Sequence, residues 1–292
     1  MFKVIETIQP ICVKRILIPI DSSSHSFAAL QAAVFMAGHY DAVLKGVYVE
    51  DIVLLGLAEM PFPQEVGDYS AIVREISIDN LTRGISVQSK WVTTTFQKLI
   101  NRSQLDGDIT ILRGKVIDII MQESQDCDLL IIGKSGKNTL GKRRLGSTTN
   151  ALIQRNEKSI LLVEEGNQIG YPLIALYDPS PIGKLSLETA RDLLGSGETL
   201  VILLDETDPD IFKENRSALS KWAANHKINI SIQNYTKRSF DHFLEMINGL
   251  KNGLFILPHI KQPQKTNIVN TCVEKITLPI LLIKYPLTDL DF

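Results

Sequence analysis

The sequence has few cysteines, few aromatic residues and almost no net charge. Its three cysteines, Cys12, Cys127 and Cys272, are far apart and odd in number, which excludes a disulfide framework and a cysteine-ligated metal cluster. Because 31 Lys and Arg stand against 33 Asp and Glu, the formal net charge is only −2. The overall charge therefore gives no reason to expect nucleic acid or an anionic membrane as the main partner.

Long hydrophobic runs are also missing. No apolar run approaches the roughly 18 residues of a membrane span, and the first ten residues lack the apolar stretch and cleavage site of a signal peptide. Hydrophobic residues still make up 44% of the chain and charged residues 22%, which are ordinary proportions for a folded protein. We therefore expect a cytoplasmic protein, and a length of 292 residues favours two domains.

Two segments of the chain share one pattern. Residues 15–23 and 172–180 are both apolar runs that end in Asp and then Ser, and a helix-like stretch follows each of them. A second match links residues 159–163 with residues 279–283. Measured between equivalent positions, the first copy spans 139 residues and the second 102, a difference of 37. The two halves are therefore interpreted as diverged copies of one unit.

Strand patterns alternate with helix patterns in both copies. Predicted strands of the first copy are 15–20, 43–49, 108–113, 128–133 and 159–164, with helices at 25–37, 78–103, 116–125 and 145–156. Predicted strands of the second copy are 172–177, 199–204, 228–235, 254–258 and 280–284. This alternation is typical of doubly wound α/β domains. The sequence predicts two tandem five-stranded parallel-sheet domains, 1–166 and 167–292, joined by the polar linker 165–170.

Residues 51–76 do not fit this alternation. The segment is long, partly apolar and absent from the second copy. A loop of this length is usually a lid, a partner surface or a disordered insert, and its apolar content favours the first two.

A glycine motif follows the fourth predicted strand. Gly133, Gly136, Gly146 and Ser147 form the spacing Gly-x2-Gly-x9-Gly-Ser between a buried strand and a helix. The glycines let the backbone turn sharply and come close to a phosphate. Residues 146–149 begin the next helix, and their N–H groups and hydroxyls would point at the oxygens of that phosphate. Five cations share this stretch: Lys134, Lys137, Lys142, Arg143 and Arg144. The alternative is a glycine-rich connection with a capped helix and a solvated basic face.

A sheet with strand order 3-2-1-4-5 would place a second wall opposite this motif. Ligands in such sheets bind outside the carboxyl ends of strands 1 and 4, so Asp21 and Gly133 should face each other. Val49, at the end of the second strand, then provides an apolar wall for a base. Alone, Asp21 would be interpreted as the N-cap of the helix that starts near Ser24. Beside the glycine motif, a nucleotide contact is the favoured role.

At these residues the sequence resembles the universal stress protein family in its tandem-domain form, with an adenine-nucleotide alpha-hydrolase-like fold. The resemblance covers nearly the whole chain in strand–helix order, and its specific motif lies in residues 133–149. The family pattern usually has proline where this chain has Ser159 and an apolar residue where it has Glu50.

The resemblance implies a set of nucleotide contacts. Asp21 and Val49 would border the adenosine, and Gly133 and Gly136 would hold the ribose and phosphate. The outer phosphates would be held by the following residues: Gly146, Ser147 and Thr149. Three further positions line such sites: Pro19, Ile132 and Thr148.

The second copy lacks the glycine motif. Residues 257–267, which follow its fourth strand, contain no glycine, and their two prolines remove backbone N–H donors. Asp178 remains and is interpreted as a helix-start residue. The second domain is therefore expected to bind no nucleotide. The resemblance also implies that the two domains meet through their last strands, 160–163 and 280–283.

These observations predict a cytoplasmic stress-response or regulatory protein that binds one ATP per chain, or ADP or AMP, with Mg²⁺ or Mn²⁺. No general base or nucleophile stands out near the phosphates, so no catalytic residue is assigned and turnover should be slow or absent. His25 is either a solvated helix-start residue or a neighbour of the ligand.

Two alternatives stay open. The chain could be a slow ATPase or nucleotidyl-transfer enzyme, or an interaction module with a vestigial nucleotide site that recruits a partner through residues 51–76. Expected partners are an adenine nucleotide and a second tandem chain in a homodimer, with neither nucleic acid nor membrane among them.

Overall fold

The structure is a computed structural model that describes residues 8–58, 64–66, 73–75, 78–134, 145–204, 206–234, 237–259 and 263–284. Contacts divide the chain into two units. The central unit is Lys14–Asn156, and the flanking unit combines Met1–Val13 with Glu157–Phe292. This division falls before the predicted boundary, so the assignment of domains 1–166 and 167–292 stays a prediction.

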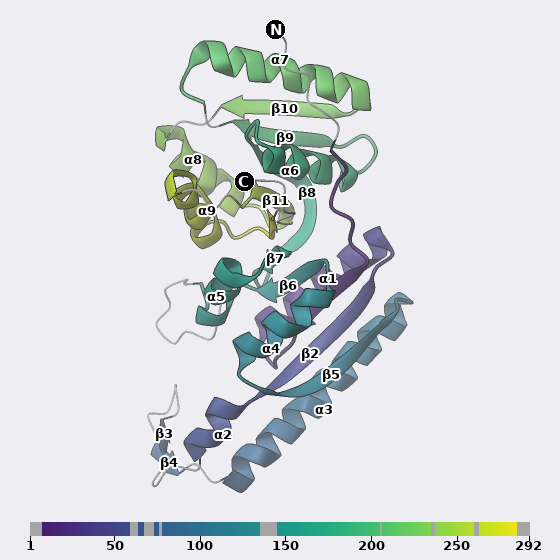
Figure 1. The fold of residues 1–292 in the computed structure, drawn as a ribbon, viewed down its shortest axis with the longest axis vertical. Coiled ribbons are helices and arrows are strands. Elements are labelled where there is room, and N and C mark those ends of the chain that lie inside the picture. The colour runs from purple at the N-terminus through teal and green to yellow at the C-terminus, as the bar shows by residue number, and fades with distance from the viewer. Residues whose placement is uncertain are drawn as a thin grey trace. The chain divides into compact units, whose positions relative to one another are not determined.

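The central unit is built on parallel strands (Figure 1). In sheet order they are β5 (Gly107–Gly114), β2 (Val43–Asp51), β1 (Arg15–Pro19) and β6 (Leu129–Gly133). Its main helices are α1 (Ser24–Tyr40), α3 (Ile78–Ser103), α4 (Val116–Glu123) and α5 (Ser147–Arg155), and a 3₁₀ turn, η1, covers Ser124–Asp126. Residues 16–18 of β1 and 129–132 of β6 are apolar and buried, as parallel strands covered on both faces should be.

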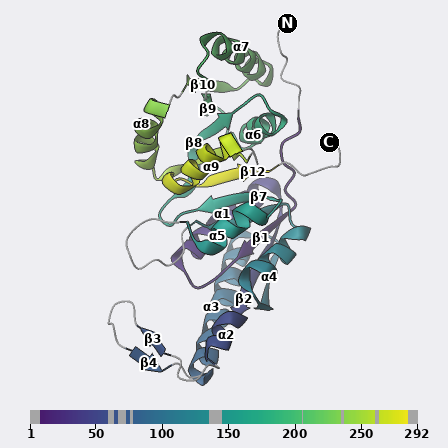
Figure 2. The same ribbon diagram turned by 60° about the vertical axis from the view of Figure 1, so that its left-hand side comes forward.

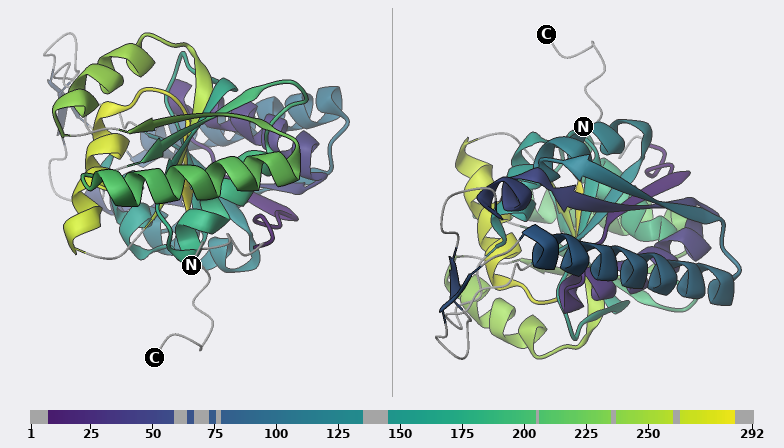
Figure 3. Two further views of the ribbon diagram at one scale, coloured as in Figure 1. Left: turned by 90° about the horizontal axis from the view of Figure 1, so that it is seen from above. Right: turned by 90° about the horizontal axis from the view of Figure 1, so that it is seen from below.

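Helices cover both faces of this sheet. Lys45 of β2 forms an ion pair with Glu123 of α4, with 2.7 Å between Nζ and Oε2. At the next residue, Gly46, an added Cβ would lie 2.9 Å from the Phe96 ring of α3. Because neighbouring strand residues point to opposite faces, α3 and α4 lie on opposite sides of the sheet. α1 contacts α3, and α4 contacts α5, so each face carries a pair of helices; α3 is seen along β5 and β2 in Figure 3.

The segment after β2 is partly regular. It contains the helix α2 (Ile52–Ala58) and two short antiparallel strands, β3 (Gln64–Val66) and β4 (Val73–Glu75). Figure 2 shows α2 beside the first turns of α3, and the two helices are in contact. The prediction of a loop through residues 51–76 is therefore wrong for these three elements, and the rest of that range lies outside the described residues.

The flanking unit repeats the same topology. Its strands are β7 (Ser159–Val163), β8 (Gln168–Tyr177), β9 (Thr199–Leu204), β10 (Asn229–Asn234), β11 (Asn252–Pro258) and β12 (Ile280–Ile283). Its helices are α6 (Pro181–Asp192), α7 (Pro209–His226), α8 (Lys237–Asn248) and α9 (Pro263–Lys275). The sheet order is β10-β9-β8-β11-β12-β7.

The predicted fold class is confirmed. The second copy, β8 to β12, has the predicted order 3-2-1-4-5, and the first four strands of the first copy, β1, β2, β5 and β6, have the predicted order 3-2-1-4. The linker prediction is wrong in part, because β8 begins at Gln168, which pairs with Asn252 of β11. Only a short turn around Gly166, with φ of +85°, separates β7 from β8.

The last strands of the two copies pair with each other, as predicted. β7 and β12 are antiparallel, and Leu161 lies opposite Leu281. Both side chains are fully buried. Because β7 is paired with β12, it is grouped with the flanking unit, although it is the fifth strand of the first copy.

Both copies begin their first helix in the same way. The Asp21 carboxylate accepts a hydrogen bond from the Ser23 N–H at 2.8 Å, and the Asp178 carboxylate accepts one from the Ser180 N–H at 2.9 Å. Ser23 is the N-cap of α1 and Ser180 the N-cap of α6. The interpretation of Asp21 as the cap is therefore wrong, since Ser23 has that role and Asp21 holds the turn before it.

No helix within the described ranges is both long and apolar enough to cross a membrane.

Truncation of Leu281 tests the pairing of the last strands. Because Leu281 is fully buried against β7, Leu281→Ala should lower the free energy of unfolding by about 2–5 kcal/mol. Met246→Ala on α8 is the control, because Met246 is 55% exposed and its loss should change stability by no more than about 0.5 kcal/mol. Urea unfolding monitored by circular dichroism measures both, and equal effects would contradict the buried pairing.

Candidate functional site

A cavity of about 390 Å³ lies at the carboxyl ends of β1, β2 and β6 in the central unit. Nine of the ten residues predicted to contact a nucleotide line it: Pro19, Asp21, Val49, Ile132, Gly133, Gly146, Ser147, Thr148 and Thr149. The tenth, Gly136, lies outside the described residues, as do Lys137, Lys142, Arg143 and Arg144. The position of the cavity is the one that the strand order predicts for a ligand.

The end of β6 is tightly packed at Gly133. A Cβ added there would lie 2.9 Å from the His25 Cβ and 3.2 Å from the His25 carbonyl carbon, at the start of α1. The Thr149 hydroxyl donates to the Gly133 carbonyl at 2.9 Å, and the Gly146 N–H donates to the Lys134 carbonyl at 3.2 Å. Glycine is thus required at 133 by the packing of α1, in addition to the predicted approach of a phosphate. The two hydrogen bonds hold the start of α5 beside the end of β6.

The first turn of α5 presents backbone N–H groups to the cavity. Gly146 is the N-cap and has no side chain to cap the helix, and its carbonyl accepts the first helical bond, from Asn150 N at 2.8 Å. The N–H groups of Ser147, Thr148 and Thr149 therefore have no partner within the helix. The Thr149 hydroxyl already donates to Gly133, so its backbone N–H is the donor that Thr149 can offer a phosphate.

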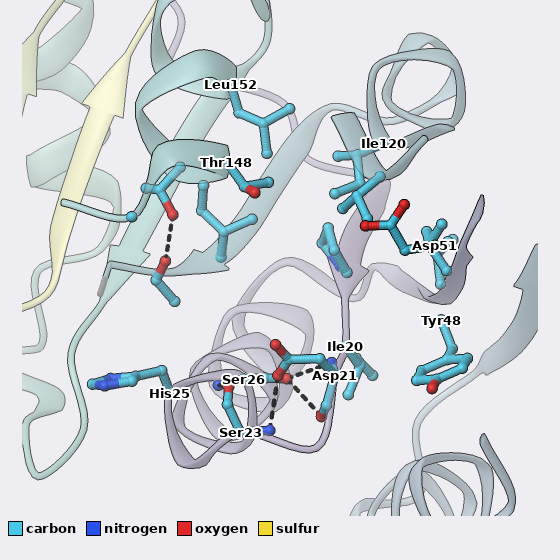
Figure 4. A pocket seen from close by; sticks show the side chains of 18 of the residues that line it. Ile20, Asp21, Ser23, His25, Ser26, Tyr48, Asp51, Ile120, Thr148 and Leu152 are labelled. Atoms are coloured by element: carbon cyan, nitrogen blue, oxygen red, sulfur yellow. Dashed lines mark hydrogen bonds between the residues drawn. The ribbon is translucent and has the colours of Figure 1, made fainter. Parts of the chain in front are cut away.

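The end of β1 contributes a carboxylate. Asp21 lines the cavity, and its backbone N–H donates to the Ser26 Oγ at 2.8 Å. Figure 4 shows Asp21, Ser23 and Ser26 together at one side of the cavity. His25 also lines the cavity, and its ring is directed away from Asp21 and Tyr48 in the same view.

The end of β2 contributes residues from both of its faces. Glu50 accepts hydrogen bonds from Arg113 of β5, from Nε at 3.0 Å and from Nη2 at 2.8 Å, both on Oε2. Tyr48 is buried, and its hydroxyl donates to the Gln88 Oε1 at 3.3 Å. Burial raises the pKa of Tyr48, and the Glu50 and Asp21 carboxylates act in the same direction, so this hydroxyl stays a hydrogen-bond donor at neutral pH.

Several lining residues were not predicted from the sequence. The helices contribute an apolar wall: Leu54 of α2, Ile85 of α3, Val116 and Ile120 of α4, and Leu152 of α5. Asp51 also lines the cavity. Strand alternation after Val49 could have found Asp51, two positions further on, but the helical wall depends on how α2, α3 and α4 pack.

Two further observations concern charge at the site. Lys134, one of the five predicted cations, is only 4% exposed, so it is not a solvated surface residue. The described residues contain no group of three or more His, Cys, Asp or Glu that could hold a metal ion.

The central unit is thus a doubly wound α/β fold with a cavity at the switch in strand order, the place where folds of this class bind their ligands. The model of the universal stress protein family matches residues 13–164, just over half of the chain. The chain belongs to the universal stress protein family.

Two curated relatives are universal stress proteins, and a solved structure shares the fold. A universal stress protein of Mycolicibacterium smegmatis is 25% identical over 181 residues, which are 61% of this chain and 58% of that protein. One of Methanocaldococcus jannaschii is 25% identical over 152 residues, which are 52% of this chain and 82% of that protein. The crystal structure of a universal stress protein from Archaeoglobus fulgidus covers 92% of this chain and 98% of its own, with 14% identity and a TM-score of 0.68. The match therefore spans less than two thirds of the Mycolicibacterium relative.

A single methyl group tests the packing at Gly133. Gly133→Ala should destabilise the protein by about 1–3 kcal/mol, because the new Cβ overlaps the start of α1. Gly38→Ala is the matched control on α1, where an added Cβ meets nothing within 4 Å. That change should leave stability unaltered or raise it by about 0.5–1 kcal/mol. Thermal unfolding of the two variants distinguishes them, and a neutral Gly133→Ala would contradict the packing described here.

Proposed function

We infer that the central unit binds one ATP per chain, or ADP or AMP, and serves a stress-response or regulatory role with little or no turnover. The observation that carries this proposal is the convergence of Gly133 and the uncapped first turn of α5 on one cavity. Free N–H groups at a helix N-terminus and the helix dipole together favour a phosphate group.

The rest of the cavity supports a nucleotide over a free phosphate. Val49, Ile120 and Leu152 provide an apolar surface within the same cavity. A planar base fits such a surface, and Asp21 offers a carboxylate acceptor for hydroxyl or amino groups of the nucleoside. A site for inorganic phosphate alone would not need this apolar part.

The proposal includes Mg²⁺ or Mn²⁺ carried by the nucleotide. The cavity wall contains three carboxylates, Asp21, Glu50 and Asp51, of which Glu50 is paired with Arg113. Mg²⁺ is commonly held by substrate phosphates and water with one or two carboxylates, so phosphate oxygens would supply most of its ligands here.

Turnover separates the proposed binding protein from the enzyme alternative. Release of ADP or pyrophosphate faster than about one per minute would favour an ATPase or nucleotidyl transferase, although typical enzymes are at least tenfold faster than that.

The third candidate function is an interaction module. It is supported by α2, where Ile52, Val53 and Leu54 are all more than 40% exposed. We also propose that tandem chains form a homodimer in the cytoplasm.

Proline at position 147 tests the backbone donors directly. Ser147 is the first residue of α5, where proline is well tolerated, and Gly146 has an extended conformation that suits a residue before proline. Ser147→Pro should therefore leave the fold intact while removing one N–H from the phosphate site. ATP affinity should fall at least about tenfold, as expected for loss of a hydrogen bond to a charged group.

The matched control is Ser147→Ala, which removes the hydroxyl and keeps the N–H. It should weaken ATP binding by no more than about threefold. Isothermal titration calorimetry with Mg-ATP measures both variants, and thermal unfolding checks their folding. Equal affinities for the two folded variants would contradict the role of the helix N-terminus.

A further inference from the structure

Asp51 is the last residue of β2 and lines the cavity, and the function proposed above assigns it no contact with the nucleoside. Strand alternation places it on the same face as Val47 and Val49, which also line the cavity. Figure 4 shows its carboxylate beside Ile120 of α4, with Thr148 and Leu152 of α5 further across the cavity. Asp51 therefore lies in the apolar part of the cavity.

The Asp51 carboxylate is held in place by the start of α2. Its Oδ1 accepts a hydrogen bond from the Val53 N–H at 2.9 Å. Within the described part of the chain, its Oδ2 has no hydrogen bond. One oxygen thus orients the group and the other is available to a ligand.

The other two carboxylates of the cavity are placed differently. Glu50 points to the opposite face of β2, and both of its bonds with Arg113 are made by Oε2. Asp21 lies at the end of β1 and holds the turn before α1 through Ser23. Asp51 is therefore the carboxylate that shares the apolar surface of Val49 and Ile120.

We propose that Asp51 determines base specificity by accepting a hydrogen bond from the exocyclic amino group of the bound purine. This inference rests on the proposed nucleotide site. With the phosphates at Gly133 and α5, the base occupies the apolar part of the cavity and its edge reaches the end of β2. An ionised carboxylate only accepts hydrogen bonds, so it favours a base edge that carries an amino group.

The preference for a base with an amino group comes from the free-energy cost of leaving the Asp51 carboxylate without a hydrogen-bond donor. When a base without the amino group binds, it removes water from Asp51 and leaves the carboxylate without a donor. Sites built to bond a ligand N–H or O–H reject analogues that lack it for this reason. The chain should therefore prefer ATP to purine riboside triphosphate, which differs from ATP only by lacking the 6-amino group.

The experiment compares these two nucleotides on the full chain. Dissociation constants for their Mg²⁺ complexes are measured by calorimetry with the unaltered protein and with Asp51→Asn. The asparagine carbonyl can still accept from Val53 N–H, so the start of α2 is preserved and its amide N–H₂ then faces the base. Asp118→Asn is the control, because it removes an equal charge from an exposed position of α4 that does not line the cavity.

The unaltered protein should bind ATP at least about tenfold more tightly than purine riboside triphosphate. Asp51→Asn should reduce that ratio to about twofold or less, and Asp118→Asn should keep it. A ratio near one in the unaltered protein, or a ratio unchanged in Asp51→Asn, would overturn the role of Asp51 while leaving the nucleotide site intact. Failure of both nucleotides to bind the unaltered protein would instead overturn the proposed function.

Discussion

The contact between the start of α1 and the end of β6 sets the geometry of the whole candidate site. Gly133 lies so close to His25 that there is no room for a Cβ, and its carbonyl accepts the Thr149 hydroxyl. The first contact brings the β1–α1 turn, and with it Asp21, up to the end of β6. The second fixes α5 so that its free N–H groups open into the same cavity. One glycine therefore holds together a carboxylate and a set of N–H donors that are more than a hundred residues apart in sequence.

Much of this arrangement could be predicted from the sequence, for identifiable reasons. Uninterrupted apolar runs such as residues 129–132 indicate buried parallel strands, and the strand order then places Asp21 opposite Gly133. The glycine spacing predicts close approach of a phosphate at Gly133. It does not predict the crowding by His25, because that contact depends on how α1 packs. The sequence offers several similar hydroxyl groups here, so spacing alone does not show that Ser23 accepts as the cap of α1 or that Thr149 donates to Gly133. The wall formed by Leu54, Ile85 and Ile120 depends on tertiary packing for the same reason.

The two copies show what is shared by the fold and what is particular to the site. Their first four strands have the same order, 3-2-1-4, and both begin their first helix with an Asp followed by a Ser N-cap. At the position equivalent to Ser26, the second copy has Gly183, where an added Cβ would lie 2.2 Å from the Asp178 carbonyl oxygen. The Asp–Ser turn is thus a structural device common to both copies. The glycine motif, and not this turn, distinguishes the copy that we propose to bind ATP.

The stoichiometry of ATP binding is the measurement that tests this account most directly. Calorimetric titration of the full chain with Mg-ATP should give one site per chain, with a dissociation constant below about 1 mM. One site is expected because only the first copy combines the glycine motif with the uncapped start of α5. Absence of binding at millimolar ATP, or two equivalent sites per chain, would contradict the central claim.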